Sequence, residues 1–177
     1  MVLINIFQDL QISSHFMATK NQPFTSLNRS ELLNANGCKI GIVVSKWNKQ
    51  VTDKLYEGAY NTLIESGLNK SNISTLHVPG SFELVYGAKF LANKEGLDCV
   101  ICLGSIIKGE TPHFDYVCNA VSLGIKDLNI HLSIPVIFGV LTDNNLEQAL
   151  DRSGGKFGNK GIESAITAIK MVNLNFK

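Results

Sequence analysis

The chain has 177 residues, which suits one domain with an extension and is long enough to bury most of its apolar surface. It carries 16 basic and 15 acidic residues, a net charge of +1, and no long basic run, which argues against nucleic-acid binding. Charged residues make up only 18% of the chain, below the usual quarter, and this favours extra buried surface in an oligomer.

The N-terminal segment is polar and interrupted by turn-forming residues, so residues 1–37 are predicted to form a partly irregular tail before an α/β domain over 38–177. The apolar residues 4–7 are a candidate for an additional edge strand. The segment lacks a basic n-region and a small-residue cleavage site, and its apolar stretch is too short to cross a bilayer. We therefore expect a cytoplasmic protein without a membrane partner.

From residue 39 onward, short apolar runs alternate with helix-like patterns. Four runs are typical of buried strands, at residues 40–44, 74–78, 99–103 and 135–141. Five helices are predicted, from a cap at Asn48 to a stop at Gly67, from Ser81 to about Leu91, and at about 114–131, 145–152 and 160–174. This alternation predicts a four-stranded parallel sheet with helices on both faces, a three-layer flavodoxin-like sandwich.

Two of the four cysteines, Cys99 and Cys102, have the spacing of a redox motif. Both lie within a predicted strand, where residues three apart point to opposite faces and cannot easily pair or share a metal. They are therefore predicted to be small apolar core residues.

The segments that follow the strands carry the polar and aromatic residues, and ligands of open α/β sheets bind where such segments gather. The candidates are Trp47 and Asn48 after the first strand, Ser81, Phe82 and Glu83 after the second, Ser105 through His113 after the third, and Phe138 and Thr142 from the fourth. Aromatic and polar groups together suit a flat heterocycle. Because histidine titrates near neutral pH, His113 is the first candidate for proton transfer.

Each of these residues also has a purely structural interpretation. Trp47 would cover a sheet edge, Phe138 would pack in the core, and His113 would be a surface loop residue. Glu83, predicted in a first helical turn, would serve only to stabilise the helix dipole.

The segment 151–161 is rich in glycine and cations and precedes a helix, which favours anion binding by backbone N–H groups and side chains. It lacks the spacing of a Walker motif. A flexible connection between two helices is an equally good interpretation.

Five stretches, in this order, resemble the motifs of the 6,7-dimethyl-8-ribityllumazine synthase family. They are Trp47-Asn48, residues 78–84, residues 103–117, residues 135–142 and the stretch from Glu147 to Gly161. The resemblance covers about residues 39 to 174. It implies a transferase of riboflavin biosynthesis that condenses 5-amino-6-(D-ribitylamino)uracil with 3,4-dihydroxy-2-butanone 4-phosphate. It implies no metal or organic cofactor, and it implies homopentamers, often packed into sixty-subunit shells, with sites between adjacent subunits.

The resemblance also implies roles for single residues. His113 is the proton carrier, and Trp47, where the family often has Phe, stacks on the pyrimidine ring. The remaining pyrimidine contacts are Ser81, Phe82, Glu83, Ser105, Ile106, Ile107 and Phe138. The phosphate contacts are Glu110, Thr111, Arg152 and Lys160. Because a carboxylate repels phosphate, Glu110 is expected to use its backbone N–H while its side chain turns away.

Two other functions fit the same sequence features. A flavodoxin-like flavin carrier would use the aromatic pocket for an isoalloxazine, but it has no evident need for His113 together with Arg152. A catalytically silent lumazine-binding shell protein would keep the pocket without turnover. Bound flavin colour and incubation with both substrates distinguish these from the enzyme.

Overall fold

The computed structural model describes residues 35–94 and 96–174, and a four-stranded parallel sheet forms its centre. The strands are β1 (Ile40–Ser45), β2 (Ile73–Val78), β3 (Cys99–Ile107) and β4 (Val136–Asp143), in the order β2-β1-β3-β4. The predicted fold class is confirmed. The edge strand suggested at residues 4–7 lies outside the described residues.

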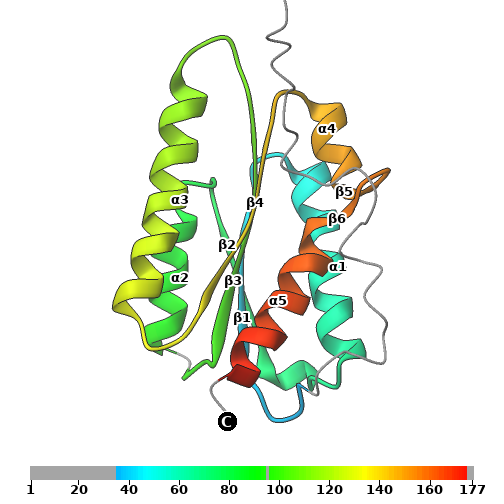
Figure 1. The fold of residues 1–177 in the computed structure, drawn as a ribbon, viewed down its shortest axis with the longest axis vertical. Coiled ribbons are helices and arrows are strands. Elements are labelled where there is room, and N and C mark those ends of the chain that lie inside the picture. The colour runs from blue at the N-terminus through cyan, green and yellow to red at the C-terminus, as the bar shows by residue number, and fades with distance from the viewer. Residues whose placement is uncertain (1–34, 95, 175–177) are drawn as a thin grey trace, which may run out of the picture.

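Helices cover both faces of the sheet (Figure 1). One face carries α1 (Lys49–Glu65) and α5 (Lys160–Leu174), and the other carries α2 (Leu84–Lys94) and α3 (His113–His131). A 3-10 turn, η3 (Lys70–Asn72), precedes β2, and the short helix α4 (Leu146–Asp151) follows β4. The segment before α5 is an antiparallel hairpin of β5 (Ser153–Gly155) and β6 (Gly158–Asn159), not the flexible connection considered from sequence.

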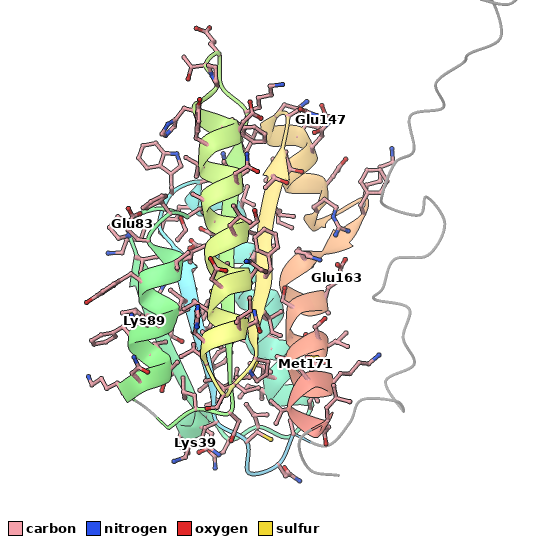
Figure 2. All side chains as sticks on the ribbon, turned by 60° about the vertical axis from the view of Figure 1, so that its left-hand side comes forward. Lys39, Glu83, Lys89, Glu147, Glu163 and Met171 are labelled. Carbon is pink, nitrogen blue, oxygen red and sulfur yellow. The ribbon has the colours of Figure 1, made fainter. Side chains whose placement is uncertain are left out.

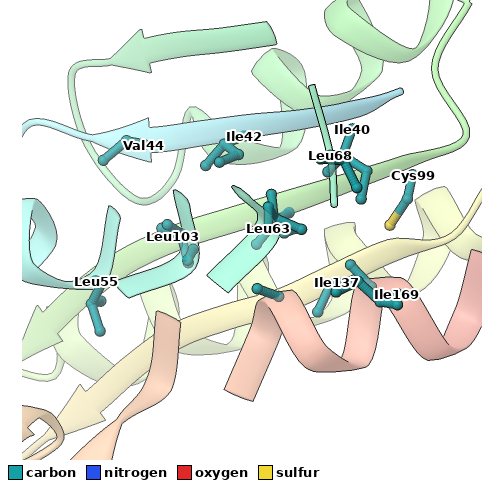
Figure 3. Packing of buried hydrophobic residues seen from close by; sticks show 14 of the residues in the cluster. Ile40, Ile42, Val44, Leu55, Leu63, Leu68, Cys99, Leu103, Ile137 and Ile169 are labelled. Atoms are coloured by element: carbon teal, nitrogen blue, oxygen red, sulfur yellow. The ribbon is translucent and has the colours of Figure 1, made fainter. Parts of the chain in front are cut away.

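Each face of the sheet has its own apolar core. On the α1/α5 face, Val51, Leu55, Ala59 and Leu63 are fully buried, which confirms the four-residue apolar spacing (Figure 3). On the α2/α3 face, buried residues of α2 and α3 pack on the other side of the same strands. Burial of a side chain of this size contributes about 1.5–3 kcal/mol, so the two cores hold the sheet rigidly beneath its connecting segments.

The two closely spaced cysteines divide between these cores as predicted. Cys99 belongs to the core under α1 and α5, and Cys102 belongs to the core under α2 and α3. Burial raises the pKa of both thiols, and that of Cys102 reaches about 12. Both are therefore packing residues and not a redox pair.

Close backbone contacts fix where α1 ends and how closely α5 packs against it. Gly67 ends the helix with φ of 94°, and the next N–H, of Leu68, donates to the Leu63 carbonyl, which confirms the predicted stop. Gly161 lets α5 approach α1 closely, since a Cβ there would collide with the Leu55 carbonyl oxygen. Ala35 is completely buried and its N–H donates to the Ser66 carbonyl, so residue 35, within the predicted tail, packs against the domain.

Two differences between the predicted and observed element boundaries change how the pocket is built. The second helix begins at Leu84 and not at Ser81, so Ser81–Glu83 form the turn that precedes it. The third strand continues to Ile107, four residues past its predicted end at Leu103. Gly104 and Ser105 interrupt the apolar run in the sequence, yet both are buried and stay in register with β4. Ser105, Ile106 and Ile107 therefore belong to a rigid strand and not to a loop.

Candidate active site

A pocket of about 530 Å³ lies at the carboxyl ends of β1, β2 and β3. Its lining combines the segment after β1, the turn before α2, the last residues of β3 and the first turns of α3. The lining residues are Trp47, Asn48, Gly80, Ser81, Phe82, Glu83, Ser105, Ile106, Ile107, Gly109, Thr111, His113, Phe114 and Val117. This is the sheet edge at which the sequence predicts a ligand site.

The structure brings most of the predicted site residues into this pocket but not all of them. Glu110, Phe138, Arg152 and Lys160 are absent from its lining within this one chain. Phe138 lies on the outer strand β4 with 37% of its surface exposed, so it is not the buried core residue considered as an alternative. Glu110 is skipped although its neighbours Gly109 and Thr111 both line the pocket.

The floor of the pocket is the last part of β3, which lacks a strand neighbour on one side. The pairing of β3 with β1 ends at Leu103 and Val44, whereas its pairing with β4 continues to Ile107 and Asp143. The N–H groups of Val100 and Lys108 point toward β4, and backbone direction alternates along a strand. The backbone of Ile107 therefore faces the open side, where its donor and acceptor are available to a ligand.

Two exposed aromatic rings line the same pocket as this open edge. Trp47 is 72% exposed and Phe82 is 60% exposed. A tryptophan that merely covered a sheet edge would bury much more of its surface, so the structural interpretation of Trp47 is not supported. The two rings offer flat faces for stacking beside a hydrogen-bonding strand.

Two buried hydroxyl groups add polar contacts that the protein itself does not use. The Oγ atoms of Ser81 and Ser105 are inaccessible to solvent and have no hydrogen-bond partner among the described residues. An unpaired buried polar group costs about 1–3 kcal/mol, so these two positions are unusual within the fold. Both serines line the pocket.

The two titratable residues at the rim, Glu83 and His113, are both exposed. The Glu83 carboxylate accepts a hydrogen bond of 2.9 Å from the Gly80 N–H and so closes the turn before α2. It therefore has a local structural role, although it precedes the helix rather than lying in its first turn. His113 is the first residue of α3 and lines the pocket together with Trp47 and Asn48 of the segment after β1.

The remaining predicted cations form a separate cluster at the N-terminus of α5. Arg152 Nη1 and Nη2 lie 3.1 and 3.3 Å from the two Glu163 carboxylate oxygens, and Lys160 Nζ lies 3.2 Å from one of them. Glu163 has only 9% of its surface exposed. Figure 2 shows Glu163 and Glu83 on opposite sides of the sheet, which separates this cation cluster from the pocket within one chain.

Asn159 joins the backbone segments that carry the cation cluster, a role that the sequence analysis missed. Its amide nitrogen donates to the carbonyls of Lys54 and Ser153, and its oxygen accepts from the N–H groups of Gly161 and Ile162. The N–H groups at the start of α5 are thus already occupied. Of the two kinds of anion contact predicted for this segment, these N–H groups therefore already have protein partners, and only the side chains remain for such a contact.

Comparison with known proteins agrees with this geometry. The sequence profile of 6,7-dimethyl-8-ribityllumazine synthase matches residues 37–175. The chain belongs to this family.

Curated relatives support the same conclusion, and each carries the name 6,7-dimethyl-8-ribityllumazine synthase. The protein of Cytophaga hutchinsonii is 56% identical over 142 residues, which cover 80% of this chain and 89% of the relative. Those of Christiangramia forsetii and Parabacteroides distasonis are each 52% identical over 159 residues. These two alignments cover 89% and 90% of this chain, and 95% and 99% of the respective relatives.

The lumazine synthase fold places a further carboxylate, Asp143, at the end of β4. Burial raises the pKa of Asp143, while the positive charge of Arg152 acts to lower it. Its Oδ2 atom is buried without a hydrogen-bond partner in the described structure.

Within residues 35–94 and 96–174, no cluster of three or more His, Cys, Asp or Glu side chains could hold a metal ion, and no helix is long and apolar enough to span a membrane.

Proposed function

We propose that this chain catalyses the condensation of 5-amino-6-(D-ribitylamino)uracil with 3,4-dihydroxy-2-butanone 4-phosphate to 6,7-dimethyl-8-ribityllumazine. The observation that carries the proposal is the open edge of β3, in a pocket that also contains the exposed rings of Trp47 and Phe82. A pyrimidine is flat and has alternating donors and acceptors along its edge. Such a ring can pair with the Ile107 backbone while Trp47 stacks on its face.

The two ends of the pyrimidine substrate would meet different parts of the lining. Ser105, Ile106 and Ile107 hold the ring edge, while Ser81, Phe82 and Glu83 contact the ring and the ribityl chain. Ser81 and Ser105 line this part of the pocket beside the exposed Glu83 carboxylate, and such polar surroundings favour a polyhydroxylated ligand over an apolar one.

The chemistry requires little more than positioning and proton transfer. The 5-amino group attacks the ketone and water leaves to form an imine, phosphate is then eliminated, and ring closure with loss of water gives the lumazine. His113, at the rim beside the ring, carries protons during these steps. Holding both substrates in contact supplies the rest of the acceleration.

The phosphate end of the second substrate would lie against Arg152 and Lys160, with Thr111 and the backbone N–H of Glu110 opposite. A guanidinium matches the geometry of phosphate oxygens, and Arg152 and Lys160 together outweigh the single charge of the Glu163 carboxylate that they share. The exposed Glu110 side chain is outside the pocket lining, in keeping with a backbone contact only.

These two halves of the site lie apart in one chain, so the complete site would form between neighbouring subunits. Phe138, Arg152 and Lys160 of one subunit would complete the pocket of the next in a homopentamer. The exposed Trp47, Phe82 and Phe138 would be covered in such a contact. Family resemblance and the short connection 154–158 extend this proposal to a sixty-subunit shell, which native mass measurement tests directly. We place this assembly in the cytoplasm.

The test of the proposed activity is incubation of the purified full chain with both substrates, with each omitted in turn. Formation of 6,7-dimethyl-8-ribityllumazine and release of phosphate only when both are present would support it. A colourless protein that binds the pyrimidine without turnover would instead identify a silent binder. A tightly bound flavin would identify a flavin carrier.

A further inference from the structure

Asn48 is the one non-glycine residue with positive φ in the described part of the chain, at φ 56° and ψ 47°. Asparagine tolerates this left-handed conformation better than most residues, but the conformation still costs energy. Strained residues that persist near a ligand pocket are often held there for a purpose, and Asn48 lines the pocket.

The side chain of Asn48 does not do what the sequence predicts. It occupies the position before α1 but makes no capping hydrogen bond to that helix. Its amide nitrogen instead donates a hydrogen bond of 2.9 Å to the carbonyl of Ser105, 57 residues away. The prediction of a capping role is therefore wrong, because the amide is used across the sheet.

The reason lies in the end of the strand pairing. Ser105 extends beyond the last β1–β3 pair, Val44 and Leu103, so its carbonyl has no partner from a neighbouring strand. The next available N–H on the β1 side is that of Trp47. It donates a hydrogen bond of 3.3 Å to the Ser45 hydroxyl and so does not reach the Ser105 carbonyl. The Asn48 amide thus occupies the place of a missing strand neighbour.

We propose that Asn48 is a positioning residue, which ties the Trp47 segment to the open edge of β3 and so sets the spacing between the stacking ring and the backbone that pairs with the pyrimidine. This inference rests on the proposed function. Asn48 acts through Trp47 and Ser105. Asn48, the residue after Trp47, is hydrogen-bonded to β3 at the floor of the pocket. Trp47 can therefore be 72% exposed in one chain and still be held in place.

Two substitutions separate the effect of the Asn48–Ser105 hydrogen bond, the tether, from the effect of the backbone conformation at residue 48. Asn48→Asp keeps the shape and the tolerance for positive φ, and its charge is favourable at the start of α1, but it lacks the N–H donor. Asn48→Gly accepts the φ value without strain and removes the side chain. If only the backbone conformation mattered, both variants would behave as wild type. If the tether matters, both are impaired.

The measurements are the KM of each substrate and the time-resolved fluorescence anisotropy of Trp47, the only tryptophan in the chain. Loss of one hydrogen bond predicts a rise of about 2- to 12-fold in the KM of the pyrimidine substrate. The KM of the butanone phosphate should stay unchanged. The anisotropy of the free protein should gain a fast component, since the ring is no longer held.

Asn129 offers a matched control. Its side-chain amide also donates to a strand carbonyl, that of Val136, at 2.8 Å, but it lies on the last turns of α3, away from the pocket. Asn129→Asp should reduce thermal stability and leave both KM values and the Trp47 anisotropy unchanged. Circular dichroism and native mass confirm that each variant folds and assembles.

Wild-type KM and anisotropy in Asn48→Asp would overturn the proposal, as would a loosened Trp47 with an unchanged pyrimidine KM. Equal rises in both KM values would also overturn it, since a tether beside the pyrimidine should not affect the phosphate end. If wild-type protein shows no turnover, the proposed function fails. The anisotropy of the free protein then still tests whether Asn48 holds Trp47.

Discussion

Arg152 and Glu163 form a two-point ion pair in which both terminal nitrogens of the guanidinium face both carboxylate oxygens, at 3.1 and 3.3 Å. The Arg152 Nη1 atom also donates to the Phe157 carbonyl at 2.8 Å, and Lys160 shares the carboxylate. One buried acid therefore holds both proposed phosphate-binding cations. Such an arrangement fixes the guanidinium plane before any anion arrives.

We expect Glu163→Gln to weaken binding of the phosphate substrate. An amide offers one acceptor oxygen and turns an N–H group toward a cation, so Arg152 and Lys160 lose a shared partner. The expected cost is about 1.5–3 kcal/mol in stability, together with a raised KM for the butanone phosphate alone. The matched control is Glu147→Gln on α4, where the acid is exposed. A lowered KM would mean that Glu163 competes with phosphate instead of orienting its ligands.

Replacing Arg152 should change the KM of one substrate far more than that of the other. We expect Arg152→Ala to raise the KM of the butanone phosphate strongly and that of the pyrimidine little, because the guanidinium is the proposed counter-ion of the phosphate. Arg152→Lys retains the charge without the two-point geometry and should show an intermediate effect. The measurement is the KM of each substrate at saturation with the other. Equal effects on both would indicate a structural role for the ion pair.

His113→Ala should slow product formation while leaving pyrimidine binding nearly intact. General acid–base help is typically worth about 10²–10⁴-fold, and an intrinsically easy condensation predicts a loss at or below the lower end. Because alanine is a good helix former, the start of α3 should remain folded. The control is His131→Ala at the last residue of the same helix. An unchanged rate at saturating substrates, with normal assembly, would exclude the assigned role.

The sequence predicted the parts of the fold that depend on local periodicity. The buried stripe Val51, Leu55, Ala59 and Leu63 and the opposite placement of Cys99 and Cys102 follow from the helix and strand periods alone. The extension of β3 through Ser105 could not be predicted this way. There the register with β4 overrides an interruption in the apolar run.

The candidate site was predictable only where side chains follow strand ends directly. The pocket residues from Trp47 to His113 meet because parallel strands end at one edge. The bond from Asn48 to the Ser105 carbonyl joins residues 57 apart, and nothing in the local pattern encodes it. Glu163 resembles any acid in a first helical turn until the hairpin brings Arg152 beside it.

The buried cysteine of the α2/α3 core predicts a pH dependence of stability. Burial raises the pKa of Cys102 from its ordinary value of 9.0 to about 12. Above pH 9 the unfolded chain loses this proton and the folded chain keeps it, so the free energy of unfolding falls as the pH rises toward the folded pKa. Urea unfolding from pH 8 to 11 should show a shallower fall in Cys102→Ala than in wild type. Parallel curves would contradict the assignment.

The shared site is testable by mixing two variants that are each impaired in a different half of the site. His113 borders the pocket of one chain, whereas Arg152 lies in the separate cluster at α5, outside the pocket lining. A head-to-tail contact in a closed ring brings such different surfaces together. We therefore expect His113→Ala and Arg152→Ala chains, unfolded and refolded together in equal amounts, to recover activity above that of either weakened parent.

The size of the recovery follows from the geometry. If each site takes His113 from one subunit and Arg152 from its neighbour, random assortment around the ring gives about a quarter of the interfaces two intact halves. If one chain supplied both residues, every chain in the mixture would carry one defect and no interface could be intact. Native mass spectrometry must show that the particles contain both chains, and separately refolded parents combined afterwards serve as the control. Activity that stays at the average of the parents in mixed particles would refute the shared site, because intact interfaces would then be present without restoring turnover.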